Sequence, residues 1–214
     1  MAAATAAQMK VGTTTTGEGR TDLRRDQMLR AAAELIAERG FSETRISDVA
    51  TRAGASPALV VYYFGTKDQL LTEALRWSER AFYVAAGELL AQRRGIRSRL
   101  ETLVRLTCVP RGRDDESMGS WGLWFDLWAQ AFRHPEVARD RVELEQRWRD
   151  LIARVVLDSV DDGEIDQVDA DNLAVTFAAL LDGLSIQVAL ADPVLDQARA
   201  QEIAMRFAAT SLGF

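Results

Sequence analysis

Residues 49–63 carry the strongest constraint on the fold, because two short helical patterns flank a single glycine. Small Ala50 stands where two helices would cross, and a larger side chain there would push them apart. Gly54 falls in the turn, where glycine accepts a left-handed backbone without steric cost. The pattern predicts a helix-turn-helix. Its inward residues are expected to be Val49, Ala53, Val60 and Tyr63.

Residues that interrupt helices are scarce, with four Pro and fourteen Gly among 214 residues. The stretches between them are rich in Ala, Leu, Glu, Arg and Gln, which favour helices. We therefore expect an all-α protein of about nine helices. The expected ranges are 22–40, 44–53, 56–64, 66–95, 96–108, 119–133, 135–159, 168–190 and 194–212.

Two of these helix starts carry capping residues. Ser56 followed by Pro57 places an N-cap before a proline at the first helical position. Thr66 with Gln69 three residues later fits a capping box after a turn at Gly65. Three short helices would thus precede one long helix, and that helix would couple the two parts of the chain if it continues across their junction.

We expect three parts along the chain. Residues 1–20, rich in Ala, Thr and Gly, are predicted to be a disordered arm, since they bury too little apolar surface to repay the entropy of ordering. Residues 21–66 would form the helix-turn-helix unit. Residues 67–214 would form a larger helical domain, which is longer than a dimer clamp requires and is therefore expected to bind a ligand and to dimerise.

The net charge of −6 argues against a nucleic-acid partner only if it is spread evenly. Residues 20–76 hold nine basic and eight acidic side chains, whereas residues 77–214 hold sixteen basic and twenty-three acidic ones. An acidic body thus carries a near-neutral N-terminal unit, whose basic groups can still gather on one face.

Several classes of site and location are disfavoured. A single cysteine, Cys108, and a single histidine, His134, disfavour disulfide, zinc and triad chemistry. The acidic residues between 158 and 169 do not fit the spacing of a calcium loop. No apolar run is expected to cross a bilayer and residues 1–19 lack a secretory pattern, so we expect a cytoplasmic protein with no membrane partner and no cofactor.

The N-terminal pattern resembles the TetR family of transcriptional regulators over roughly fifty residues. The matching stretches are 25–40, 44–50 (TRISDVA), 53–56 (AGAS), 63–64 (YF) and 67–71 (KDQLL). The resemblance implies a ligand-responsive regulator, usually a repressor that a small apolar or cationic effector releases from double-stranded operator DNA. It also implies that residues 56–63 enter the major groove and that a homodimer sets the half-site spacing.

The resemblance also implies the DNA contacts. Lys67 lies at a helix N-terminus, where free N–H groups favour a phosphate, although a solvated lysine is the alternative. The family usually has a tyrosine where this chain has Val61, so Tyr62 is expected to take over that contact. The candidate DNA-binding residues are Arg25, Thr44, Arg45, Ser47, Ser56, Pro57, Ala58, Val61, Tyr62, Tyr63 and Lys67. Lys10, Arg20 and Arg24 either follow the DNA or belong to a charged tail.

Large rings are concentrated in two neighbouring helices of the larger domain. They either line a cavity or form ordinary core, and a cavity of this kind would suit an apolar molecule or an organic cation. The candidate pocket residues are Trp121, Trp124, Phe125, Trp128 and Trp148, and the candidate counter-charges are Asp126, Glu101 and Glu145. Residues 56–60, the Trp-rich segment and residues 181–184 resemble the choline-responsive repressor branch, which places a quaternary amine or polyamine slightly ahead of other effectors.

Apolar stripes along the last two helices predict the homodimer interface, with small residues allowing close approach. The candidate interface residues are Phe177, Leu180, Leu181, Leu184, Val188, Ile203 and Phe207. Two other functions remain open. An enzyme built on a helical bundle would need a nucleophile with a base or an inward metal motif, and we find neither. A ligand-binding dimer that has lost specific DNA binding is kept open by Val61.

Overall fold

The computed structural model describes residues 15–108, 121–133 and 135–214. Within these ranges the chain forms nine α-helices and no strand, which confirms the predicted all-α class. The helices are α1 (Thr15–Arg39), α2 (Ile46–Arg52), α3 (Pro57–Phe64), α4 (Lys67–Ala91), α5 (Ile96–Cys108), α6 (Trp121–Arg133), α7 (Pro135–Asp161), α8 (Ala170–Ala189) and α9 (Gln197–Leu212).

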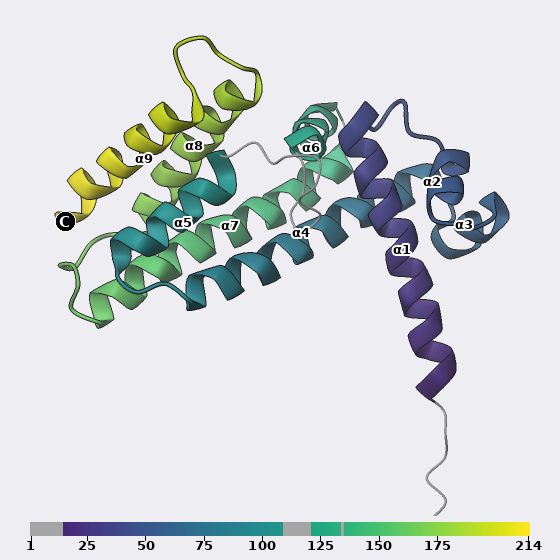
Figure 1. The fold of residues 1–214 in the computed structure, drawn as a ribbon, viewed down its shortest axis with the longest axis horizontal. Helices are drawn as coiled ribbons and strands as arrows, with labels where there is room; N and C mark the ends of the chain where they lie inside the picture. Colours follow the sequence, from purple (N-terminus) through teal and green to yellow (C-terminus); the bar gives the residue numbers. More distant parts are fainter. Residues whose placement is uncertain (1–14, 109–120, 134) are drawn as a thin grey trace, which may run out of the picture.

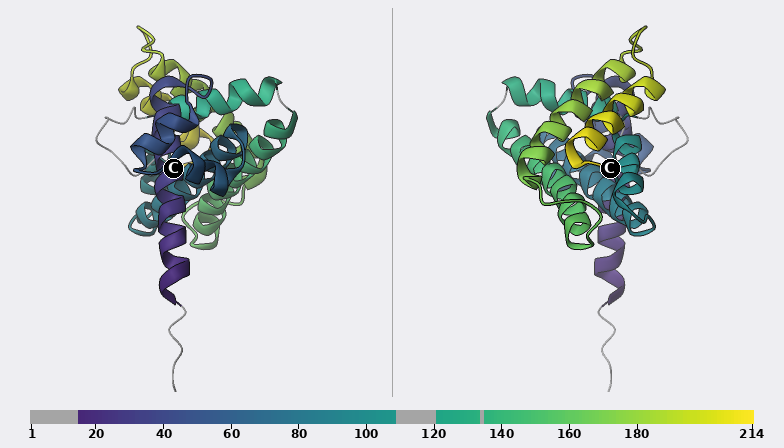
Figure 2. Two further views of the ribbon diagram at one scale, coloured as in Figure 1. Left: turned by 90° about the vertical axis from the view of Figure 1, so that its right-hand side faces the viewer. Right: turned by 90° about the vertical axis from the view of Figure 1, so that its left-hand side faces the viewer.

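The helices gather at the two ends of an elongated molecule. Figure 1 shows α1, α2 and α3 at one end and α5, α8 and α9 at the other, with α4 and α7 extending along the length between them. Helix α6 packs on both α1 and α7. The end-on views in Figure 2 show the N-terminal part of α1 projecting beyond the other helices.

Each end of the molecule has its own hydrophobic core. The N-terminal core joins α1, the helix-turn-helix and the first turns of α4, and the body core joins α5, α7, α8 and α9. Each large side chain that is fully buried in them stabilises the fold by about 1.5–3 kcal/mol. Among the largest of these side chains are Met28, Leu35, Leu71, Ile152 and Phe177.

Helix α4 contributes to both cores without interruption. Leu70, Leu71 and Ala74 are buried in the N-terminal core, and Phe82 and Leu90 pack against the body core. Helix α4 is continuous from Lys67 to Ala91, so one uninterrupted helix joins the two cores. The N-terminal core also extends past residue 66, where the sequence suggested a domain boundary.

The helix-turn-helix and its caps form as the local sequence predicts. Gly54 adopts a φ of +62°, and the Ala55 N–H donates to the Ala50 carbonyl across 2.8 Å to close the turn. The Ser56 hydroxyl accepts from the Leu59 N–H at 3.2 Å, and Pro57 is the first residue of α3. The capping box of Thr66 with Gln69 is also present.

Several boundaries differ from the sequence expectation; among them, α4 ends at Ala91 and not at 95, and α9 begins at Gln197 and not at 194. Helix α1 begins at Thr15, inside the segment predicted to be a disordered arm, and α7 continues to Asp161. Helix α2 begins at Ile46 because Arg45, with an extended backbone, is its N-cap. The predicted start of a helix at residue 119 lies outside the described residues.

Helix α8 corrects the expectation that no apolar run approaches membrane-spanning length. By length and composition alone this helix could cross a bilayer. It packs on α5, α7 and α9, and Phe177 and Leu181 are among its buried side chains. The core helix of a soluble protein passes the same test, so length and composition alone are weak evidence for a membrane span.

Candidate functional site

Helix α3 presents an unusually apolar outer face to solvent. Val60 and Phe64 are buried and hold the helix against the N-terminal core, whereas Tyr62 is 81% exposed and Val61 is 46% exposed. Of the other candidates on this helix, Ser56, Pro57 and Ala58 are also exposed, and Tyr63 is half-buried with its ring edge-on to Tyr62. An exposed face of this kind on a short, well-capped helix is suited to contact with a partner.

The start of α2 adds a positive charge beside this face. Arg45 is exposed, and its guanidinium has no hydrogen-bond or ion-pair partner among the described residues. Ser47 is exposed as well, in the first turn of α2. The other two arginines near α2 are committed to ion pairs, Arg39 with Asp48 at 3.1 Å and Arg52 with Glu38 at 2.6 Å.

Lys67, the first residue of α4, connects that helix to the turn that follows α1. Its Nζ donates to the Ser42 carbonyl at 3.0 Å and lies 5.7 Å from the centre of the Phe41 ring. An ammonium has three donors, so two are left for an anion. The N-terminus of α4 supplies further donors at the same place.

Two residues predicted to contact DNA also have partners within the chain. Thr44 is only 1% exposed, and its hydroxyl donates to the Gly40 carbonyl at 2.8 Å, so its side chain stabilises the turn before α2. Arg25 pairs with Glu73 and lies 5.4 Å above the Phe64 ring, bracing the end of α3 against α4. The buried Thr44 side chain is not available to a phosphate, whereas the Arg25 guanidinium is partly exposed and keeps further donors, so its DNA contact stays a prediction.

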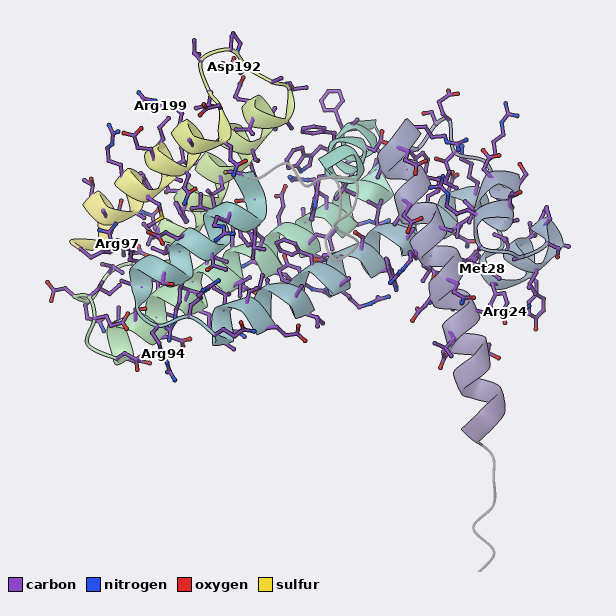
Figure 3. All side chains as sticks on the ribbon, in the orientation of Figure 1. Arg24, Met28, Arg94, Arg97, Asp192 and Arg199 are labelled. Carbon is purple, nitrogen blue, oxygen red and sulfur yellow. The ribbon has the colours of Figure 1, made fainter. Side chains whose placement is uncertain are left out.

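The N-terminal basic residues are only partly described. Arg24 is exposed on α1, one turn before buried Met28, and Figure 3 labels both. Lys10 and the side chain of Arg20 lie outside the described residues. Of the residues proposed to follow the DNA, only Arg24 can therefore be placed.

A narrow cleft lies between α4, α6 and α7. Its lining consists of Leu75, Ser78, Glu79, Phe82, Trp124, Leu127 and Leu144. The space it encloses is about the size of one water molecule. A larger molecule can enter only if these helices move apart.

Glu79 is the charged residue of this cleft, and the sequence analysis did not identify it. The residue is 2% exposed, and its Oε2 lies 3.3 Å from Nη1 of Arg147. Its buried Oε1 has no hydrogen-bond partner within the described residues. Burial raises the pKa of the Glu79 carboxyl, and Arg147 opposes that shift. One indication was available in the sequence: Glu79 falls on the helical stripe of Leu75, Phe82 and Ala86, where an apolar residue is expected.

Of the predicted ring residues whose side chains are described, one lines the cleft. Trp124 lines it, whereas Trp148 is buried in the body core with its ring centre 5.9 Å from that of Phe82. Phe125 and Trp128 form a tilted pair, 6.0 Å between ring centres. Trp121 is the first residue of α6, and its side chain lies outside the described part.

The predicted counter-charges are engaged elsewhere or lie outside the cleft. The Asp126 carboxylate accepts from the Phe41 N–H at 2.8 Å, and Glu145 pairs with Arg141. Glu101 lies on α5, which contributes no side chain to the cleft. Glu79 therefore replaces these three as the candidate anion.

A half-buried carboxyl with a raised pKa lies on α8, away from the cleft lining. Burial raises the pKa of Asp182 to about 6, and the nearby Glu145 acts in the same direction. Arg141 and Arg149 oppose this shift. Asp182 is thus a second acid in the body whose pKa is raised but which contributes nothing to the lining of the cleft.

Most of the predicted dimer residues face the chain's own core. Phe177, Leu181, Leu184 and Val188 are each no more than 9% exposed, because α8 turns this stripe toward the body core. Phe177 stacks on Phe207 with 6.0 Å between ring centres. Phe207, Leu180 and Ile203 are half-buried. The exposed side of α8 instead carries Val175, Ala179 and Gly183, spaced one helical turn apart.

Two family models match the chain, one in its N-terminal part and one in its C-terminal part. Residues 28–74 match the family of bacterial regulatory proteins of the tetR type, and residues 95–213 match the C-terminal region of BetI-type transcriptional repressors. These two matches fall on the N-terminal unit and on the body.

Relatives and solved structures agree with these matches. The HTH-type transcriptional regulator BetI of Burkholderia lata is 30% identical over 190 residues, covering 87% of this chain and 92% of its own length. BetI of Escherichia coli K12 is 28% identical, covering 88% and 94%. A transcriptional regulator from Saccharomonospora viridis, solved in complex with choline, is 29% identical with a TM-score of 0.77, covering 90% of this chain and 98% of its own.

Proposed function

Because the chain belongs to the TetR family and has the C-terminal region of BetI-type repressors, we propose that it binds operator DNA and releases it when a quaternary ammonium compound of the choline type enters the cleft beside Glu79. The observation that carries the choice of ligand is Glu79, a buried carboxylate with one unpaired oxygen among aromatic rings. Such a regulator acts on DNA, so we assign it to the cytoplasm.

The chemistry of the cleft supports an organic cation. A quaternary ammonium has no N–H group to donate, so it is bound by a negative charge and by the faces of aromatic rings. Glu79 supplies the charge, and Phe82 and Trp124 supply rings. Ser78 adds a hydroxyl for a polar group elsewhere on the ligand. The choline complex of the Saccharomonospora viridis regulator supports the same ligand class.

The DNA-binding surface is proposed to consist of the outer face of α3 with the start of α2 and the start of α4. Tyr62 and Val61 are the most exposed large residues of α3, Arg45 has no partner among the described residues, and Lys67 retains two donors. Base reading by hydrogen bonds would be limited on so apolar a helix. Contacts of Ala58 and Val61 with thymine methyl groups fit its composition better.

The homodimer is proposed to form through the exposed side of α8. TetR-family regulators dimerise, and the Val175, Ala179 and Gly183 ridge allows a second helix to approach closely. A Cβ placed on Gly183 would meet no atom within 4 Å in the same chain, so this space is free for a partner.

Choline should release the protein from DNA taken from the region upstream of its own gene. We expect an affinity decrease of at least about tenfold, within the usual range for coupled sites. Fluorescence anisotropy of labelled DNA measures it. The matched control is 3,3-dimethyl-1-butanol, in which a carbon replaces the charged nitrogen, and it should have little effect. Equal release by both compounds would contradict the cation site, and absence of selective DNA binding would favour the ligand-binding dimer without DNA function.

Arg45→Ala should weaken operator binding and lower the slope of log affinity against log salt concentration by about one, since one phosphate contact is lost. Binding measured between 50 and 200 mM salt, which are about the usual limits for this comparison, gives the slope. Arg94→Ala is the control, because Figure 3 shows Arg94 at the opposite end of the molecule from α2 and α3. An unchanged slope for Arg45→Ala would remove this residue from the surface.

A further inference from the structure

One hydrogen bond connects the helix that lines the cleft to the DNA-binding end of the chain. The Oδ2 atom of Asp126 on α6 accepts from the backbone N–H of Phe41 at 2.8 Å, joining residues 85 positions apart. Both residues are half-buried, which limits competition from water. Figure 1 shows α6 next to the end of α1 from which this turn leaves, and the two helices are in contact.

The turn after α1 is shaped around this carboxylate. Gly40 has a φ of +87°, and a Cβ there would lie 3.3 Å from Asp126 Oδ2, so glycine permits both the backbone and the close approach. Thr44 binds the Gly40 carbonyl, and Lys67 binds the carbonyl of Ser42. The turn is therefore fixed by α6 on one side and by the first residue of α4 on the other, directly before α2 begins.

The same part of α6 lines the cleft. Trp124 and Leu127 face the cleft, and Asp126 lies between them in sequence. Because the enclosed space is about that of one water molecule, an organic cation must displace α6 from α4 or α7 in order to enter. A helix moves as a unit, so Asp126 moves with the wall. A shift of about 1 Å away from Phe41 would stretch this bond beyond hydrogen-bonding distance.

We propose that Asp126 is the residue that transmits ligand binding from the cleft to the DNA-binding unit. Ligand entry moves α6 and breaks the bond to Phe41, and the released turn then shifts the start of α2 together with Lys67. The ligand binds the state in which α6 has moved, because the cleft is too narrow for the ligand before α6 moves. This difference in ligand affinity between the two states is what coupling requires. The inference rests on the proposed function, since it concerns how the cleft controls DNA binding.

Asp126→Ala should separate the two binding events. Without choline, its operator affinity should fall toward that of the choline-bound wild type, and choline should lower it less than twofold further. Choline itself should still bind, as measured by the fluorescence of the tryptophans. Asp126→Asn is the matched variant, because the amide oxygen can accept the same hydrogen bond, and it should keep the wild-type ratio of operator affinities. If Asp126→Ala keeps that ratio as well, the inference is wrong.

Amide hydrogen exchange of the wild-type chain gives a second measurement that depends on no variant. Choline should accelerate exchange in the peptide that contains Phe41 and leave peptides of α9 unchanged. Unchanged exchange at Phe41, in a protein that choline does release from DNA, would overturn the role of Asp126 and leave the proposed function intact. If choline does not release the wild-type chain from DNA, the proposed function fails. The structural role of Asp126 is then tested by DNA binding without choline, where Asp126→Ala should still bind the operator more weakly than Asp126→Asn.

Discussion

A Glu79→Gln variant should bind choline at least about 30-fold more weakly than the wild type, because the loss of a buried charge partner costs about 2 kcal/mol or more. The amide keeps the size of the side chain and leaves the cleft without its anion. Isothermal titration with choline measures the loss. The variant should also stay on operator DNA at choline concentrations that release the wild type.

The pH dependence gives an independent check on Glu79. Burial raises the pKa of this carboxyl above its ordinary value of 4.5, whereas the charges of Arg147, Arg80 and Arg76 lower it and that of Glu143 raises it. The cation binds the ionised form, so wild-type affinity should fall as the pH is lowered through the raised pKa, and that of Glu79→Gln should not follow the same curve. Asp182→Asn, which changes the half-buried acid with a raised pKa outside the cleft, is the control. If it loses choline binding and Glu79→Gln does not, the counter-charge has been misassigned.

Phe177→Ala should destabilise the fold by about 3–5 kcal/mol, since a fully buried ring that stacks on Phe207 is replaced by a cavity. Urea unfolding at several protein concentrations measures this and separates folding from association. Phe132→Ala is the control, because Phe132 is 92% exposed on α6 and its loss should change stability by less than about 0.5 kcal/mol.

Gly183→Glu, on the exposed side of the same helix, should affect dimerisation and not folding. It should weaken dimerisation at least about tenfold, because a charge is forced against the partner helix, and leave the unfolding of the monomer nearly unchanged. Sedimentation equilibrium measures the association, and Gly87→Glu on α4, another exposed glycine with no atom near its Cβ position, is the control. If Phe177→Ala instead reduces only dimerisation, the inward orientation of this stripe is incorrect.

Features that depend on neighbouring residues were predictable from the sequence. The Ser56 cap, the capping box at Thr66 and the left-handed turn at Gly54 each form within a few residues, and all three are present. The continuous α4 was predictable as well, because no residue between 67 and 91 interrupts a helix except Gly87. Local chemistry of this kind sets the helices and the order in which they follow one another.

Features that depend on distant packing were not predictable in the same way. Helical spacing identifies the stripe that contains Phe177, but it does not say whether that stripe faces the chain's own core or a second chain. The density of large rings on two neighbouring helices likewise groups Trp124 with Trp148, although one lines the cleft and the other is buried in the body core. Thr44 and Asp126 take their roles from partners on other segments, and only the folded chain shows those partners.

The continuity of α4 determines where this chain can be joined to another regulator. A hybrid cut at residue 66 would remove Leu70, Leu71 and Ala74 from the core they complete with α1 and the helix-turn-helix. The better junction lies within α4 between Trp77 and Phe82, where one core ends and the other begins. Even there the splice must keep helical phase, because one added residue turns everything that follows by about 100°. Exchange of DNA specificity between such proteins thus depends on the rotational alignment of the two parts of α4 as much as on surface residues.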